Sequence, residues 1–143
     1  MEKPLIVLDQ GARDVGLAEM MFNLIRQNLE QNPRKIKGFN SLDAKVMIEA
    51  RDIQIIIGLE FKQGKLTISK DSSFKPDLHI ITDSATILAL CLLKIKFGLP
   101  YFFDANGFKV LKKLLARQLI IRGLLNHFFV LVKLTKVFSV IRN

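Results

Sequence analysis

The sequence predicts an α+β domain in which a sheet with one buried face packs against very apolar helices. Residues between Lys45 and Thr82 alternate between apolar and polar side chains, which is typical of antiparallel strands with one buried and one solvated face. The segments before and after that region have the 3.6-residue periodicity of helices. Half of the 143 residues are hydrophobic and the mean hydropathy is +0.27, which excludes intrinsic disorder and fits one small domain.

The N-terminal elements are an extended segment and a helix. Residues 5–9 predict a short extended arm, and we expect residues 1–16 to form an N-terminal arm outside a single domain at 17–143. A helix is expected from Gly16 to Gln31, where Leu17, Met20 and Leu24 fall on one broad apolar stripe. Asn32 and Pro33 end this helix.

Four strands are expected in the middle of the chain, at residues 45–50, at 53–61, around Leu66 and Ile68, and at 78–82. The second of them alternates most clearly, and its apolar positions share one face: Ile53, Ile55, Ile57, Leu59 and Phe61. Gly64 follows this strand and can take a positive φ, which predicts a hairpin to the third strand.

The C-terminal part is expected to contain three helices and one short strand. Asp83 is a predicted N-cap for a helix at 84–97, which Gly98 and Pro100 would end. Further elements are a helix at 105–116, a strand at 118–122 and a last helix at 124–140. The last helix is apolar around most of its circumference. Such a helix is buried on nearly all sides or contacts another apolar surface.

Positive charge is concentrated at the C-terminus. The chain has a net charge of +9, yet residues 1–104 carry 14 Lys or Arg against 13 Asp or Glu. Residues 105–143 carry eight Lys or Arg and no acidic residue. A one-sided basic region attracts polyanions. Because these cations alternate with Leu, Ile, Val and Phe, and no nucleic-acid motif is present, an anionic lipid surface is favoured over nucleic acid.

Few residues are candidates for catalysis, phosphate binding or metal binding. The glycines at 11 and 16 have the spacing of a phosphate-binding loop, but Leu17 and Ala18 replace the Lys-Ser/Thr pair that such a loop needs. The only soft metal ligands are His79, Cys91 and His127, and they lack ligand spacing. Cys91 lies among leucines, which is typical of a buried thiol. We therefore expect no cofactor, no metal, no catalytic residue and no enzymatic activity.

The chain also lacks the signals of a membrane-spanning or secreted protein. Its longest charge-free runs, such as residues 84–93 and 123–132, hold 10 residues, whereas a membrane span needs about 20. The apolar stretch near the N-terminus is too short for a signal peptide. With one cysteine, no intrachain disulfide can form. We expect a cytoplasmic protein that associates peripherally with the inner face of a membrane.

Three segments resemble the sterol-carrier-protein type 2 family. Residues 52–66 (DIQIIIGLEFKQGKL) are similar to its central hairpin, and residues 76–90 (PDLHIITDSATILAL) to its next strand and helix. Residues 112–123 (KKLLARQLIIRG) are similar to its last strand. The resemblance covers residues 17–140 and rests on apolar and glycine patterns. The first 16 residues have no counterpart, and the helix after Gly123 is longer and more apolar than in the family.

The resemblance implies a five-stranded, mostly antiparallel sheet with helices on one face that enclose an apolar cavity. It also implies non-enzymatic binding and transfer of a lipid, which would be long-chain acyl, isoprenoid or sterol-like. We expect a continuous cavity of ligand size between the sheet and the helices. Its predicted lining residues are Ile53, Ile55, Ile57, Leu59, Leu88, Leu92, Phe128 and Val132.

The last helix is also a candidate for membrane docking. Phe129, Lys133 and Lys136 share one helical face, so an aromatic side chain lies beside two cations, as in interfacial helices. The alternative is a protein-interaction scaffold that uses the same helix to bind a protein partner or a second copy of the chain. Both interpretations use the same apolar residues, and the sequence leaves them open.

Overall fold

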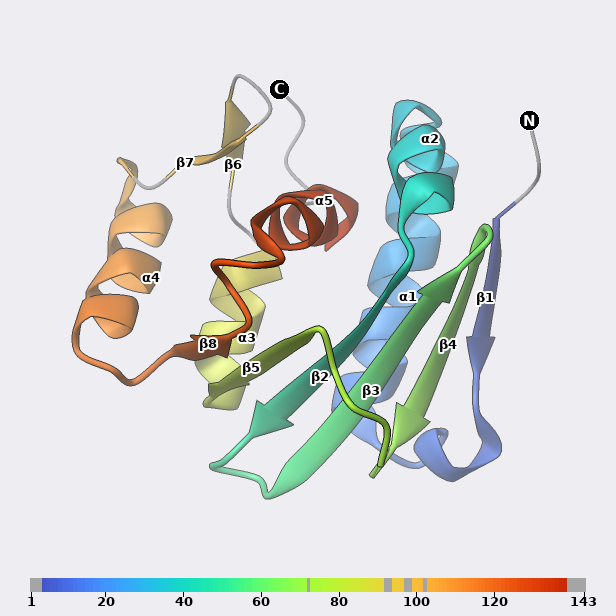
Figure 1. The fold of residues 1–143 in the computed structure, drawn as a ribbon, viewed down its shortest axis with the longest axis horizontal. Coiled ribbons are helices and arrows are strands. Elements are labelled where there is room, and N and C mark those ends of the chain that lie inside the picture. The colour runs from blue at the N-terminus through green and yellow to red at the C-terminus, as the bar shows by residue number, and fades with distance from the viewer. Residues whose placement is uncertain (1–3, 72, 92–93, 97–98, 102, 139–143) are drawn as a thin grey trace.

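A six-stranded mixed sheet forms the centre of the protein, whose structure is a computed structural model (Figure 1). The model describes residues 4–71, 73–91, 94–96, 99–101 and 103–138. The strands lie in the spatial order β1-β4-β3-β2-β5-β8. Their bounds are β1 Leu5–Leu8, β2 Ala44–Ala50, β3 Ile55–Lys62, β4 Lys65–Lys70, β5 Leu78–Thr82 and β8 Ile120–Arg122. The helices are α1 Gly16–Gln31, α2 Arg34–Ser41, α3 Ser84–Cys91, α4 Ala105–Leu115 and α5 Phe128–Phe138.

The predicted α+β class is confirmed, whereas the predicted number of strands is wrong. The extra strand is β1, which pairs in parallel with β4. The Leu5 amide donates to the Gly64 carbonyl at 2.9 Å, and the Asp9 amide donates to the Ile68 carbonyl at 2.9 Å. The sheet therefore includes residues on both sides of the boundary expected at residue 16. A second parallel pairing joins β2 to β5, and the other pairings of this sheet are antiparallel.

The alternating strands bury one face of the sheet as expected. Val46, Ile48 and Ala50 of β2 are at most 4% exposed, while Lys45 between Ala44 and Val46 is exposed. Ile57 and Leu59 lie opposite Ile48 and Val46 in the antiparallel register. The buried apolar face therefore continues across neighbouring strands.

The helices α1, α3 and α5 pack against this apolar face and against one another. In Figure 1, α1 and α3 lie behind the sheet and α5 crosses above its β5 end. The short helix α2 packs on α5, and its Phe39 ring meets the Phe61 ring of β3 edge to face at 5.9 Å. Such an aromatic pair adds about 0.5–1.5 kcal/mol beyond the burial of its apolar area.

One helix was not predicted, and several element boundaries differ from the prediction. The helix α2 was not predicted, because its eight residues carry five polar or charged side chains around Ile36 and Phe39. The helix expected at 84–97 is shorter, since residues 94–96 form a strand, β6, which pairs with β7 at Leu99–Tyr101. The last helix begins at Phe128, and residues 139–143 lie outside the described part of the chain. Finally, β3 begins at Ile55, because residues 51–54 form a turn.

Asn28 joins α1 to the end of α5. Its side-chain amide is buried and donates to the carbonyls of Val137 and Phe138, each at 2.9 Å. Carbonyls in the last turn of a helix have no partner inside the helix. We expect Asn28→Leu to lower the free energy of unfolding by about 2 kcal/mol, because two buried acceptors lose their donor. Urea unfolding measures this change, with Asn23→Leu on the exposed face of α1 as the control. Equal stability of the two variants would contradict the proposed role of the amide.

Candidate functional site

An apolar pocket lies where the sheet meets α1, α3 and α5. Its walls come from all four: Met21 of α1, Ile48 of β2, Ile80 of β5, Ile87, Leu90 and Cys91 of α3, and Leu131, Leu134, Thr135 and Phe138 of α5. The pocket has a volume of about 40 Å³, whereas ligand sites typically have about 300–1,000 Å³. Around these residues the structure is therefore closed, and the ligand-sized cavity that we expected is not open there.

Two carboxylates hold the beginning of α3, which forms one wall of the pocket. Asp83 accepts a hydrogen bond from the Thr86 amide at 2.7 Å, the arrangement of an N-cap. Asp52, in the turn between β2 and β3, accepts from the Ser84 hydroxyl at 2.5 Å and from its amide at 2.8 Å. These bonds from Ser84 lower the pKa of Asp52, and those from Thr86 lower the pKa of Asp83. The N-terminus of α3 is thereby tied to the sheet.

The lining offers few polar groups. Thr135 carries the one hydroxyl among the lining residues, and that hydroxyl donates to the Leu131 carbonyl of its own helix at 2.8 Å. Cys91 is 5% exposed, and burial raises the pKa of its thiol to about 12. A thiol with that pKa stays protonated at neutral pH, and the thiolate is the reactive form. The pocket therefore has the chemistry of a binding site for apolar groups.

Of the predicted lining residues that the structure describes, none is in the wall of this pocket. Ile57, Leu59 and Val132 are buried in the core, Ile55 is half-buried, and Leu92 lies outside the described residues. Three others are exposed: Ile53 by 44%, Leu88 by 45% and Phe128 by 46%. The predicted elements α3 and α5 do line the pocket, through residues on other faces of the same helices.

The physical reason is the apolar character of these two helices. On α3, Ile87, Leu88 and Leu90 point in different directions, and all are apolar. When a helix is apolar on every side, its sequence does not indicate which face is buried. On the sheet, Ile48 of β2 and Ile80 of β5 line the pocket, because β2 lies between β3 and β5. Which strands line the pocket depends on the strand order, and the alternation of side chains within a strand does not reveal that order.

The predicted docking residues lie on the outer side of α5. Phe129 is 76% exposed, while Val132 and Leu134 of the same helix are buried. Lys133 and Lys136 are half-buried and follow Phe129 on the same helical face. Phe129 also meets the Phe128 ring edge to face at 5.8 Å. An exposed aromatic group with two cations is therefore present as the sequence indicates.

The described residues contain no cluster of metal ligands. No three His, Cys, Asp or Glu side chains in this part of the chain lie close enough to hold a metal ion. None of its helices is long and apolar enough to cross a membrane. His79 of β5 lies on the opposite face of the sheet from Ile80, and burial lowers its pKa. It therefore lies on the other side of the sheet from the pocket and is not among the lining residues.

The fold is that of sterol-carrier-protein type 2 domains. A solved structure of a ubiquinone synthesis protein, UbiJ-SCP2, superposes with a TM-score of 0.60 and 12% identity, over 85% of this chain and 91% of that one. A crystal structure of sterol carrier protein 2 superposes with a TM-score of 0.50 and 13% identity, over 88% of this chain and 95% of that one. No protein-family model matches the sequence, and no curated protein is significantly similar to it.

Proposed function

We propose that the protein binds the apolar chain of a lipid between its sheet and its helices α1, α3 and α5, and exchanges that lipid with membranes. The observation that supports this proposal is the pocket itself, whose wall is assembled from ten almost entirely apolar residues of five elements. The fold shared with a sterol carrier protein supports it further. Binding and release involve no covalent step, so no catalytic residue is needed.

The closed pocket has to widen before a lipid chain can enter. A volume of about 40 Å³ exceeds the space needed for one water molecule and is far below that of a lipid chain. The energy for widening comes from the ligand, because each buried methylene contributes about 0.8 kcal/mol. Ten methylenes would contribute roughly 8 kcal/mol before the costs of association. The α3 and α5 walls are the elements that would separate, since the sheet strands are held by their ladders.

The lining favours a ligand whose buried part has no polar groups. The Thr135 hydroxyl is already bonded within α5, so a buried hydroxyl or amide of the ligand would find few partners there and would be costly to desolvate. A long-chain acyl or isoprenoid chain meets this condition. A sterol-like ligand does so when its hydroxyl stays at the pocket entrance.

Exchange with a bilayer requires the protein to approach its surface. The basic region beyond residue 104 and the exposed Phe129, with Lys133 and Lys136, provide attraction to anionic head groups and an aromatic anchor. We propose that this part of the chain docks on anionic membranes. The alternative is a protein-interaction scaffold, which Leu125 favours because it is 96% exposed in the turn before α5.

Cys91 provides a direct test of binding, because it lies in the pocket wall and is the only cysteine of the chain. We expect alkylation of the native protein by iodoacetamide at neutral pH to be slow, since the thiol is buried with a pKa of about 12. Oleate should slow the reaction about tenfold further by filling the pocket. Mass spectrometry measures the rate, and butyrate, whose chain is too short to fill the pocket, is the control.

The same experiment separates the two candidate functions. A carrier also retains lipid, so solvent extraction of the denatured protein should yield a fatty acid, isoprenoid or other lipid in near-stoichiometric amount. A scaffold would yield none and would leave the alkylation rate unchanged by oleate. That pair of results would overturn the carrier proposal. Protection of Cys91 without retained lipid would mean that the pocket binds lipid weakly, and exchange would then be fast.

A further inference from the structure

The amphipathic helix α4 carries a second exposed apolar stripe that the proposed pocket does not use. One side of α4 packs on α3: Gly107 and Val110 are buried, and the Asn106 side chain donates to the Ala89 carbonyl at 2.9 Å. The other side carries Phe108, Leu111 and Leu115, spaced three and four residues apart, of which Leu111 is half-buried. Phe108 is 59% exposed and Leu115 is 76% exposed. A stripe of this kind marks an interaction surface.

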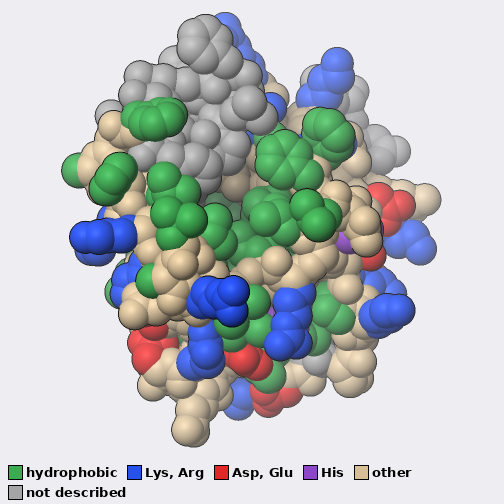
Figure 2. Space-filling view, turned by 60° about the vertical axis from the view of Figure 1, so that its left-hand side comes forward, with side chains coloured by type: hydrophobic (Ala, Val, Ile, Leu, Met, Phe, Trp, Pro, Cys, Tyr) green, Lys and Arg blue, Asp and Glu red, His purple; other side chains and the backbone are tan. Residues whose placement is uncertain are grey.

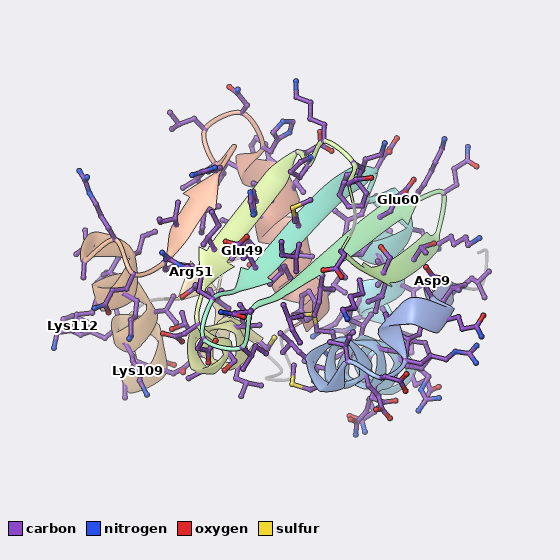
Figure 3. The ribbon with its side chains drawn as sticks, turned by 90° about the horizontal axis from the view of Figure 1, so that it is seen from below. Asp9, Glu49, Arg51, Glu60, Lys109 and Lys112 are labelled. Atoms are coloured by element: carbon purple, nitrogen blue, oxygen red, sulfur yellow. The ribbon has the colours of Figure 1, made fainter. Side chains whose placement is uncertain are left out.

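Cations border this stripe. Lys109 and Lys112 are exposed on α4, and Figure 3 shows both extending from the helix away from the sheet. Lys113 points elsewhere, with its ammonium 3.7 Å from the Asp83 carboxylate. Figure 2 turns α4 toward the viewer and shows a band of hydrophobic side chains across this face, with Lys and Arg side chains below it. No acidic residue occurs between positions 105 and 138. The two acidic residues that adjoin α4 in the described part of the chain are Asp83, which faces Lys113, and the N-cap Asp104, which accepts from the Gly107 amide at 2.7 Å.

We propose that α4 is an interfacial helix that inserts Phe108, Leu111 and Leu115 into an anionic bilayer while Lys109 and Lys112 bind its head groups. The proposal rests on the proposed function, because it identifies the surface through which a lipid carrier would meet a membrane. An apolar stripe bordered by lysines is the pattern of helices that lie in the plane of the interface. Each lysine near an anionic surface contributes to the attraction, which decays within a Debye length of about 8–10 Å.

Charge excludes a second copy of the chain as the preferred occupant. A two-fold interface brings the same patch of both subunits together, so Lys109 and Lys112 would approach the same lysines of the second copy, while the adjoining Asp83 and Asp104 are already engaged by Lys113 and the Gly107 amide. Like charges across an interface oppose association. In an anionic bilayer, the acyl chains would contact the apolar stripe and the head groups would contact the lysines. The bilayer would also lie next to the pocket, because α4 packs directly on α3, whose Ile87 and Leu90 form the pocket wall.

The absence of tryptophan makes a clean test possible, since the chain contains none. Phe108→Trp introduces a single reporter at the N-terminal end of the stripe, and Leu5→Trp introduces one at a comparably exposed site, 54% exposed on β1. The probe is a vesicle of phosphatidylcholine and phosphatidylglycerol, with brominated lipid as a depth-dependent quencher. We expect blue-shifted, quenched emission from Trp in the first variant and unchanged emission in the second.

Charge variants test the cations separately. Lys109→Glu/Lys112→Glu should weaken vesicle binding at least fivefold, whereas Lys62→Glu/Lys65→Glu, at exposed positions of the β3–β4 hairpin, should change it less than twofold. Pure phosphatidylcholine vesicles should bind the wild type weakly. Unshifted emission from the Phe108→Trp variant on vesicles that bind the protein would overturn the proposal. A blue shift at high protein concentration without vesicles would also overturn it, because that shift would indicate binding of a second copy.

Oleate protection of Cys91 distinguishes failure of this proposal from failure of the proposed function. The Lys109→Glu/Lys112→Glu variant should keep that protection, because neither lysine lines the pocket. Protection without vesicle binding at α4 would overturn the docking inference and leave lipid binding intact. Vesicle binding at α4 without protection would support the docking surface and overturn the pocket as the lipid site.

Discussion

Gly123→Ala should lower the free energy of unfolding by about 3–5 kcal/mol, which is a large part of the stability of a small domain. Gly123 has a φ of 86°, where a residue with a Cβ is strained by about 1–3 kcal/mol. An added Cβ would also overlap the carbonyl oxygen of Asp77. A shift of packed backbone typically costs a further 1–3 kcal/mol.

The position of Gly123 explains why the backbone cannot easily give way. The residue lies between β8 and α5, and its carbonyl accepts from the His127 amide at 2.9 Å. Asp77 on the other side precedes β5, and its amide donates to the Lys45 carbonyl at 2.7 Å, while its carboxylate accepts from the Lys45 amide at 2.9 Å. The glycine thus allows β8 and the entry to α5 to approach the beginning of β5.

Gly38→Ala is the matched control for this prediction. Gly38 lies inside α2, with nothing within 4 Å of an added Cβ, so alanine should raise stability by about 0.5–1 kcal/mol. Urea unfolding followed by circular dichroism measures both variants. A Gly123→Ala protein as stable as the wild type would mean that the β8–α5 connection tolerates a different backbone path.

The strands could be predicted from the sequence because one face of the sheet is buried and the other contacts solvent. In β3, Ile57, Leu59 and Phe61 are buried while Glu60 is not, and this contrast produces the period of two. The same logic locates β5 at Leu78–Thr82, where the structure has it. It does not predict β1, since Ile6, Val7 and Leu8 are all partly buried and give no alternation. Pairing of β1 with β4 is a long-range contact, which no local pattern specifies.

The candidate site could be predicted only at the level of elements. Both α3 and α5 were expected to line it, and both do, but their apolar surfaces hide which residues face inward. The docking surface of α4 was missed for a different reason. Its Phe108 and Leu115 have the helical spacing of core residues, and only their exposure in the folded protein separates them from the buried Val110. Charge bias in the sequence indicated the region, but not the helix.

Lys133→Glu/Lys136→Glu should reduce binding to anionic vesicles by a factor of about ten or more. The two substitutions change the local charge by four units, and each lysine near an anionic surface contributes about 1 kcal/mol. Both lysines lie on the same face of α5 as Phe129, which is 76% exposed. The buried side of the helix, with Val132, Leu134 and Val137, is untouched, so the fold should be retained. Sedimentation with phosphatidylglycerol-containing vesicles measures the change.

The α2 helix offers a control with the same spacing and the same change of charge. Arg34 and Lys37 are exposed and three residues apart on α2, and Arg34→Glu/Lys37→Glu should lower vesicle binding far less, because α2 carries no exposed apolar anchor like Phe129. Binding of the wild type should also weaken steeply between low and physiological salt, since screening shortens the range of the attraction. An equal loss in both variants would show that the net charge of +9 acts as a whole. If neither salt nor the α5 substitutions change vesicle binding, the result would instead favour a protein partner for α5.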